Sequence, residues 1–400
     1  MIIFQSLERA GRELSSTILG KVLKVQKISL PDLRRALDRG EVRKILLVRN
    51  YQGMGDLLCA SPVIAGLKSR FPGASIHFLA NTFNQSALQN NPGLEKIWAW
   101  DEGRKADPRQ WINFRNRLRQ ERFDLALVLS GNALSLTAIL LAVLSGARWV
   151  AGYETKAYGQ NWGSRLYSCE VPFMPVVREI DRYAGLLEGL GISCPNRFPE
   201  FFIRPDQIAF AEAFWNKHFS SKELSVVGVF LGGKVDRPDR IWPPENYARV
   251  ARRLVEITGR ALLVIAPPQP GSRPLHKRES TFWMDEAVHE QLFHRAYGEV
   301  FPVFRSPDLG RVAAVLRKLD LFICPDGGMM HLAAAIRVPT LTLFFGTNPE
   351  IWHPSVATSH YLRAPDNDPR ALDPERVVQE AATLLKPLSA DLWSPSNETH

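Results

Sequence analysis

Residues 322–335 combine residue types and spacing that bind phosphate groups in proteins. An apolar run ends at Asp326, Gly327 and Gly328, and small, helix-favouring residues continue to Ile336. A strand, a glycine turn and a helix N-terminus in this order direct unpaired backbone N–H groups and the positive end of a helix dipole outward. Because the two glycines carry no side chains, a phosphate can reach that backbone. The stretch therefore predicts either an anion site with Asp326 as the helix N-cap, or an ordinary helix start with a tight turn.

Basic residues near the glycines of the C-terminal half add to this potential for binding phosphate. Lys234, Arg237 and Arg240 follow two glycines and precede a predicted helix, which is the arrangement a diphosphate requires. A solvated basic loop is the alternative for this cluster. His331 lies one turn into the anion-binding helix, where it could reach a phosphate or a leaving group. Packing of His331 against another helix is equally consistent with the sequence.

A carboxylate that could move a proton lies in the N-terminal half. The loop from Arg49 to Asp56 follows a predicted strand and contains Gly53 and Gly55, which bring the backbone close to a bound ligand. Asp56, at the head of the next helix, could take a proton from an attacking hydroxyl as a general base. It could instead cap the helix, which is a common position for Asp. No third glycine follows at the spacing of a dinucleotide-binding fingerprint.

The elements that must position these residues alternate between strand and helix in both halves of the chain. This alternation predicts an α/β fold of parallel sheets with helices on both faces. In the N-terminal half, strands are expected at 44–49, 75–80, 125–129 and 149–153, and helices up to 70 and at 106–122 and 133–145. In the C-terminal half, strands are expected at 225–231, 260–266, 319–323 and 338–345, and helices at 244–258, 311–318 and 332–336.

Four segments follow from this pattern and from the length of 400 residues, which exceeds one ordinary domain. The polar stretch 195–205 is a candidate linker between two doubly wound halves, and we expect a ligand cleft between the carboxyl ends of their sheets. The segments are an N-terminal basic extension at 1–42, an N-terminal Rossmann-like domain at 43–205, a C-terminal Rossmann-like domain at 206–387 and a disordered tail at 388–400. Residues 267–299 have no assignable pattern.

Composition limits the class of partner. The chain has 50 Lys and Arg against 41 Asp and Glu, a net charge of +9, which suits a polyanionic partner. No helix-turn-helix, zinc finger or basic–aromatic repeat is visible, so we do not expect nucleic acid to be that partner. The four cysteines form no CxxC pair, and His289 and His294 are poorly spaced for one metal on a helix face. With no DxD pair at a strand end, the sequence predicts neither a metal ion nor a cofactor.

Two segments bear on contact with a membrane. Apolar residues at helical spacing in 2–22 and an excess of basic residues in 1–44 predict an amphipathic helix. That helix would lie on an anionic membrane surface or pack on the protein's own body. Residues 125–147 are uncharged, but Ser130, Gly131 and Asn132 interrupt them, so a buried strand and helix are expected rather than a membrane span. With no secretory signal at the start, we expect a cytoplasmic protein.

Taken together, these residues resemble glycosyltransferase family 9, the lipopolysaccharide heptosyltransferases, over about residues 43–385. Several motifs in the same order are more specific than any one of them. The resemblance rests on residues 44–62, 148–153, 240–246, 326–331 and 344–352.

This resemblance implies a GT-B architecture of two Rossmann-like domains facing across a cleft, with 43–205 as the acceptor domain and 206–387 as the nucleotide-sugar donor domain. It also implies inverting, metal-independent transfer of a heptose, with ADP-heptose as donor and a lipopolysaccharide core or related cell-envelope glycolipid as acceptor. Asp56 matches the family's carboxylate in the Arg…Gly-Asp loop and would be the base that activates the acceptor hydroxyl. Arg240 falls where the family usually has a Lys that contacts the donor phosphates. Asp326, Gly327, Gly328 and His331 fall in the family's donor-binding segment.

The chain departs from the family pattern in three places. Gly327 stands where the family usually has Thr, which removes a hydroxyl from the donor site. The residues 267–271 are rich in proline, where a glycine-rich turn and a Glu that commonly holds the donor ribose are expected. Residues 1–42 extend before the usual start. Two alternative functions therefore stay open: a sugar-nucleotide epimerase or hydrolase on the same scaffold, and a catalytically weak relative that acts as a binding module.

Overall fold

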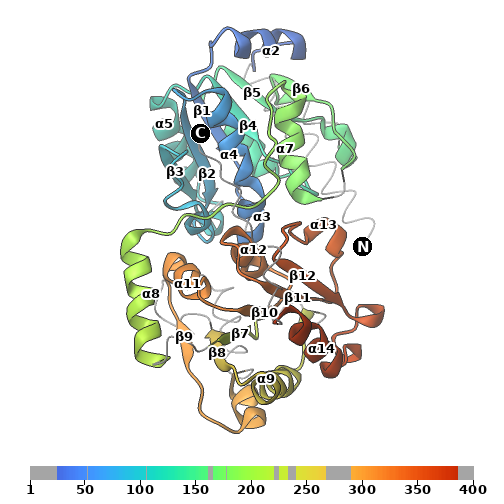
Figure 1. Ribbon diagram of the computed structural model, residues 1–400. Coiled ribbons are helices and arrows are strands. Elements are labelled where there is room, and N and C mark those ends of the chain that lie inside the picture. Colours follow the sequence, from blue (N-terminus) through green and yellow to red (C-terminus); the bar gives the residue numbers. More distant parts are fainter. Residues whose placement is uncertain are drawn as a thin grey trace, which may run out of the picture. The chain divides into compact units, whose positions relative to one another are not determined.

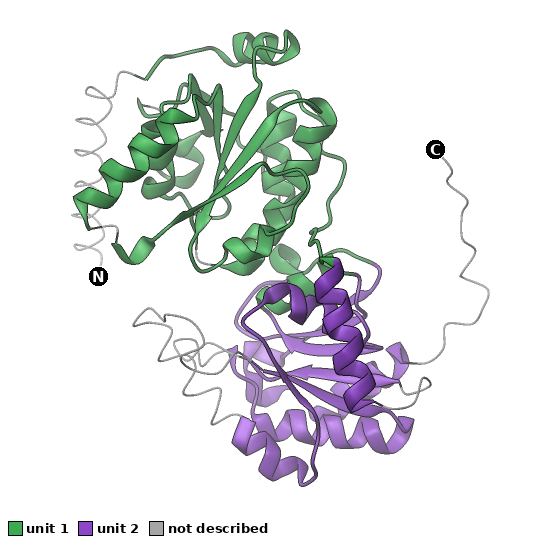
Figure 2. Cartoon of the chain, turned by 90° about the vertical axis from the view of Figure 1, so that its left-hand side faces the viewer, with its two compact units in different colours: residues 1–204, 327–336, 350–356 green, residues 205–326, 337–349, 357–400 purple. Residues whose placement is uncertain are grey.

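The computed structural model describes residues 25–51, 53–104, 106–160, 165–176, 178–219, 225–232, 240–266 and 290–385. The chain forms two compact units, coloured separately in Figure 2. Unit 1 comprises residues 1–204, 327–336 and 350–356, and unit 2 comprises residues 205–326, 337–349 and 357–400. Residues 1–24, Lys234, Arg237, the insert at 267–289 and the tail at 386–400 lie outside the described residues.

Unit 1 is built on a parallel sheet of six strands in the order β3-β2-β1-β4-β5-β6 (Figure 1). The strands are β1 (Lys44–Val48), β2 (Ser75–Asn81), β3 (Lys96–Trp100), β4 (Leu125–Val128), β5 (Trp149–Tyr153) and β6 (Cys169–Val171). The helices of its first segment are α2 (Leu30–Asp38), α3 (Met54–Ala60), α4 (Pro62–Arg70), α5 (Pro108–Gln120), α6 (Leu136–Leu144) and α7 (Glu179–Gly189). The unit also contains α12 (Gly328–Ala335) and most of the short α13 (Pro349–Trp352).

Unit 2 repeats the same architecture, with a second six-stranded parallel sheet in the order β12-β11-β10-β7-β8-β9. Its strands are β7 (Val226–Phe230), β8 (Ala261–Ala266), β9 (Val303–Arg305), β10 (Leu321–Pro325), β11 (Thr340–Phe344) and β12 (Ser359–Arg363). Its helices include α8 (Pro205–His218), α9 (Pro244–Thr258), α11 (Leu309–Leu316) and α14 (Pro374–Leu384).

Both sheets have the same topology. In each, the chain starts at a central strand, adds strands towards one edge, and then crosses back to add strands on the other side of the first strand. In unit 1 the chain runs outward from β1 to β3 and returns to place β4 on the other side of β1. In unit 2, β7 and β10 are the corresponding neighbours. In a doubly wound sheet, ligands bind at the carboxyl ends of the two strands where the order reverses. The loops after β1 and β4 in unit 1, and after β7 and β10 in unit 2, are therefore the positions where each fold is expected to bind a ligand.

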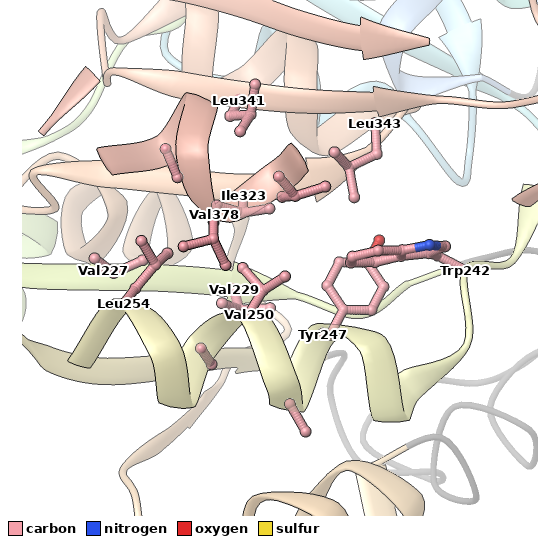
Figure 3. Close-up of a cluster of buried hydrophobic side chains, with 14 of the residues drawn as sticks. Val227, Val229, Trp242, Tyr247, Val250, Leu254, Ile323, Leu341, Leu343 and Val378 are labelled. Atoms are coloured by element: carbon pink, nitrogen blue, oxygen red, sulfur yellow. The ribbon is translucent and has the colours of Figure 1, made fainter. Parts of the chain in front are cut away.

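Each sheet is covered by helices whose apolar residues follow the alternation of the strands. In unit 2, α9 and α14 pack on the face that carries Val229, Ile323 and Leu343, as the close-up in Figure 3 shows for α9. In unit 1, α5 and α6 cover the face that includes Leu46 and Val48. Burial of both faces explains why the central strands are continuous apolar runs.

One predicted helix is in fact two. The sequence predicts a single helix up to Arg70, but α3 ends at Ala60 and α4 starts at Pro62. Pro62 has no N–H, so it cannot donate to the carbonyl of Leu58. The N–H and the hydroxyl of Ser61 bond that carbonyl instead, at 3.2 and 2.7 Å. The break leaves α3 as a short helix that carries the Asp56 loop.

Within the described ranges, no helix is both long enough and apolar enough to cross a membrane. The uncharged segment at 125–147 forms β4 and α6, as expected.

Candidate active site

Asp56 lies in the first turn of α3, directly beyond the end of β1. The N-cap of this helix is Gly53, so Asp56 does not cap it. The carboxylate turns back towards the loop: a Cβ atom added to Gly53 would lie 2.1 Å from Asp56 Oδ2. A side chain at residue 53 would therefore displace the carboxylate. The first role of Gly53 is to make room for Asp56.

Arg49, the residue after β1, holds Asp56 from within the protein. Its Nη2 donates to Asp56 Oδ1 at 2.7 Å, and its Nη1 donates to the carbonyl of Leu129 at 3.2 Å. The guanidinium also lies over the rings of Tyr51 and Tyr183, at 4.7 and 5.4 Å from their centroids. The Arg49 side chain is only 3% exposed, whereas that of Asp56 is 12% exposed. Asp56 thus has one oxygen bonded inside the protein while part of its carboxylate still meets solvent.

Glu179 is a second acid in the same cluster, and no motif in the sequence indicates it. Its side chain is fully buried, and its Oε1 lies 3.6 Å from Arg49 Nη2. Tyr183 donates its hydroxyl to the same oxygen at 2.8 Å. Burial raises the pKa of Glu179, while Arg49 and the Tyr183 hydroxyl oppose that rise. Gly131 makes room for this acid, since an added Cβ would lie 1.6 Å from Glu179 Oε1.

The charges of this cluster favour a permanently protonated Arg49. Burial by itself lowers the pKa of a guanidinium, but Tyr183, Asp56 and Glu179 together raise the pKa of Arg49 above its ordinary value. Arg49 therefore presents a fixed positive charge at the carboxyl ends of β1 and β4. A cation that is buried in this way must be balanced by nearby anions.

His331, on α12, packs against α3 within unit 1. It is 3% exposed, and its Nδ1 lies 3.6 Å from Cys59 Sγ. An added Cβ on Gly55 would lie 2.5 Å from its Cδ2 atom. Burial, and then the charge of His353, lower the pKa of His331 to about 4. These contacts are those of a helix-packing histidine, and a donor-binding role for it stays a prediction.

Asp326, the residue after β10, is not the N-cap of α12, which corrects the expectation from the sequence. Gly327 is the N-cap and has no side chain to cap with. The Asp326 carboxylate instead accepts a hydrogen bond from the Thr347 hydroxyl at 2.6 Å, and Arg240 Nη1 lies 3.9 Å from it. Burial raises the pKa of Asp326, and both partners act against that rise. The preferences of single residues could not reveal this contact, because Thr347 comes from the loop after the next strand.

Arg240 is held near Asp326 by the core of unit 2. Two residues beyond it, Trp242 is 1% exposed, packs edge-on against Tyr247 and donates its indole N–H to the carbonyl of Leu372 at 3.3 Å. The Nε of Arg240 is buried and has no hydrogen-bond partner among the described residues. The segment from 240 to 246 therefore combines a structural anchor with a cation that retains capacity to donate.

The predicted site residues thus fall into two sets, each described within its own unit. Asp56, Gly53, Gly55 and His331 belong to unit 1, and Arg240 and Asp326 belong to unit 2. Gly327 and Gly328 begin α12. Within the ranges described, no three His, Cys, Asp or Glu side chains are grouped so that they could hold a metal ion. The chemistry that these groups offer is proton acceptance at Asp56 and anion binding at Arg240 and the start of α12.

The two sheets define a GT-B α/β protein, and solved structures share this fold. A glycosyltransferase family 9 protein from Veillonella parvula superposes with a TM-score of 0.71 at 20% identity, covering 86% of this chain and 97% of that one. The E. coli heptosyltransferase WaaC, solved with ADP-2-deoxy-2-fluoro heptose, gives 0.65 at 19% identity, with 85% and 99% covered.

The sequence comparisons identify the family. The model of glycosyltransferase family 9 (heptosyltransferase) matches residues 111–376, which is more than half of the chain. Lipopolysaccharide heptosyltransferase 3 of Escherichia coli K12 is 23% identical over 310 residues, which cover 75% of this chain and 82% of that protein. The chain belongs to glycosyltransferase family 9, and it is a glycosyltransferase.

The burial of His331 makes the stability of the protein depend on pH. With a pKa of about 4 in the folded state and an ordinary value of 6.5, His331 contributes stability above pH 6.5 that is lost as the pH falls towards 4. His331→Gln removes this proton uptake. We expect the loss of unfolding free energy between pH 7 and pH 5 to be about 2 kcal/mol smaller in the variant than in the wild type. Denaturant unfolding at both pH values measures it.

His218→Gln is the control, because His218 lies exposed at the end of α8. It should leave the pH dependence unchanged. If His331→Gln and the wild type lose equal stability on acidification, His331 is not held in its neutral form by burial in the folded protein.

Proposed function

We propose that this protein transfers heptose from ADP-heptose to the lipopolysaccharide core or a related cell-envelope glycolipid. Membership of family 9 supports the class of reaction. The observation that carries the proposal is the Asp56 carboxylate, which lies beyond the end of β1. Arg49 Nη2 donates to its Oδ1 at 2.7 Å, and 12% of the Asp56 side chain remains exposed. A carboxylate that is both fixed and accessible can accept a proton from a substrate.

The proposed reaction is a single displacement with inversion and without a metal ion. Asp56 accepts the proton of the acceptor hydroxyl while that oxygen attacks the anomeric carbon of the heptose. The bond between the anomeric carbon and the phosphate oxygen breaks, and ADP leaves with the electron pair. Because Asp56 is held in place before the substrate arrives, little reorganisation is needed in the transition state.

We assign the departing diphosphate to the basic residues and the helix N-terminus of the donor segment. The Arg240 side chain is 27% exposed, so its guanidinium can donate to a phosphate oxygen. Gly327 and Gly328 start α12, whose first N–H groups have no side-chain cap. Lys234 belongs to the same basic segment in the sequence. Asp326, held by Thr347, orients Arg240 in this assignment.

We also propose that the enzyme works peripherally at the cytoplasmic face of the inner membrane, where an anionic glycolipid acceptor would be met. The net charge of +9 supports attraction to such a surface. The basic segment at 1–44 is the proposed contact.

Asp56→Asn tests the base. It keeps the size of the side chain but removes the negative charge that accepts the proton. We expect kcat for heptosyl transfer to fall at least ~100-fold, while the rise in melting temperature that ADP-heptose produces stays the same. Asp38→Asn is the matched control, because the Asp38 side chain is 72% exposed. Turnover by Asp56→Asn at the wild-type rate would exclude Asp56 as the base.

A thermal-shift comparison tests the donor. At a concentration 100 times its Kd, a ligand that binds only the folded state adds about 2.7 kcal/mol of stability. We expect ADP-heptose and ADP to raise the melting temperature, and UDP- and GDP-sugars to raise it less. A larger rise in melting temperature with a UDP- or GDP-sugar would show that ADP-heptose is not the donor. No shift with any nucleotide sugar would favour a binding module, and loss of donor without acceptor would favour an epimerase or hydrolase.

A further inference from the structure

Two carboxylates share one nitrogen of Arg49. Nη2 lies 2.7 Å from Asp56 Oδ1 and 3.6 Å from Glu179 Oε1. The Arg49 side chain is 3% exposed and that of Glu179 is fully buried, so water does not screen the interaction between them. Only Asp56 reaches solvent, which makes Glu179 the acid that faces the protein interior.

Glu179 is held by the elements around it. Tyr183, one turn further along α7, donates to its Oε1, and Gly131 after β4 leaves the space that this oxygen occupies. Its Oε2 is buried without a hydrogen-bond partner among the described residues, and Arg182 Nε lies 3.9 Å from it. Glu179 interacts electrostatically with five charged or titratable groups: Arg49, Asp56, Tyr158, Arg182 and Tyr183.

We propose that Glu179 is a positioning residue of the transfer reaction: it acts through Arg49 to hold Asp56 in place and to balance the charge of Arg49 once Asp56 is protonated. This inference rests on the proposed function, in which Asp56 is the base. It gives a reason for keeping an acid where no substrate can reach it.

The charge beside Arg49 changes during the proposed reaction. When Asp56 takes the proton of the acceptor hydroxyl, it loses its negative charge, and Arg49 cannot release a proton to compensate. A buried cation without a counter-ion is strongly destabilising. Glu179, which stays in contact with Nη2, supplies the balancing charge at that moment. Before the reaction, the negative charges of Glu179 and Asp56 repel each other across the Arg49 nitrogen that they share.

Glu179→Gln tests the proposal while keeping the size of the side chain and its contact with Tyr183. We expect the acid limb of the pH profile of kcat/KM to move about one unit to lower pH. At the optimum, kcat should fall about tenfold with the KM for ADP-heptose unchanged. Glu188→Gln, on the same helix with a side chain 37% exposed, should behave as the wild type. A purely structural role would not move the pH profile, and a profile identical to that of the wild type overturns the proposal.

Tyr183→Phe provides a second variant that keeps the ring over Arg49 and removes only the hydroxyl bond to Glu179. The acid limb should move in the same direction by a smaller amount. An unchanged profile in this variant, with Glu179→Gln also unchanged, leaves no role for the cluster in the reaction.

A double-mutant cycle measured by denaturant unfolding needs no substrate. In Asp56→Asn and in Glu179→Gln, Arg49 keeps one counter-ion, but in the double variant it has neither. We expect the double variant to lose more stability than the two single variants together. If the loss of stability in the double variant equals the sum of the losses in the two single variants, the two acids do not share Arg49 as their counter-ion. Failure of the wild type to transfer heptose would overturn the proposed function, and this cycle would still decide separately whether Glu179 and Asp56 share Arg49 as their counter-ion.

Discussion

The buried guanidinium of Arg49 is the constraint on which the arrangement of unit 1 depends. An arginine does not lose its proton in a protein, so the fold must provide partners for Arg49 where the strand order of the sheet reverses. The backbone of Leu129 comes from the end of β4, Asp56 comes from α3, and Glu179 comes from α7. Three elements that are distant in sequence are thereby tied to the residue after β1. Gly53 and Gly131 are required because these acids occupy the space that side chains there would fill.

The two units use the same topology for different chemistry. In each sheet, the loop after the strand at the point of reversal carries a polar group, and the following helix starts close by. In unit 1 this group is an arginine that holds a carboxylate. In unit 2 it is the carboxylate of Asp326, which Thr347 and Arg240 hold. The same topology therefore places a different polar group at the point where the strand order of each sheet reverses.

The sequence predicted the central strands and missed every edge strand. The eight central strands are apolar runs because both faces of each are covered by helices. The missed edge strands are short or carry polar residues: β3, β6, β9 and β12 each have exposed or half-buried positions. Pairing with the neighbouring strand forms them, and a pattern within one segment does not report that pairing.

The same limit applied to the site. The position of Asp56 in the first turn of the helix after β1 was predictable because a glycine loop followed by an acid has a local signature. Glu179 was not, because its partner Arg49 lies far from it in sequence and α7 was itself missed. The prediction that Asp326 caps α12 failed for the same reason, since Thr347 bonds it from another loop. The hydroxyl that the family resemblance placed at residue 327 is absent, and Thr347 gives Asp326 a hydroxyl partner from elsewhere.

The measurement that tests this account most directly is the rate of heptosyl transfer by variants of Arg49. Arg49→Lys keeps a positive charge between the two acids, whereas Arg49→Gln leaves Asp56 without the cation that holds it and Glu179 with Arg182 alone. If the cation organises the base, Arg49→Gln should lose at least ~100-fold in kcat, and Arg49→Lys should retain an intermediate rate. Binding of ADP-heptose, followed by its thermal shift, should be preserved in both. A wild-type kcat in Arg49→Gln would contradict the account, because Asp56 would then act without the residue that holds it.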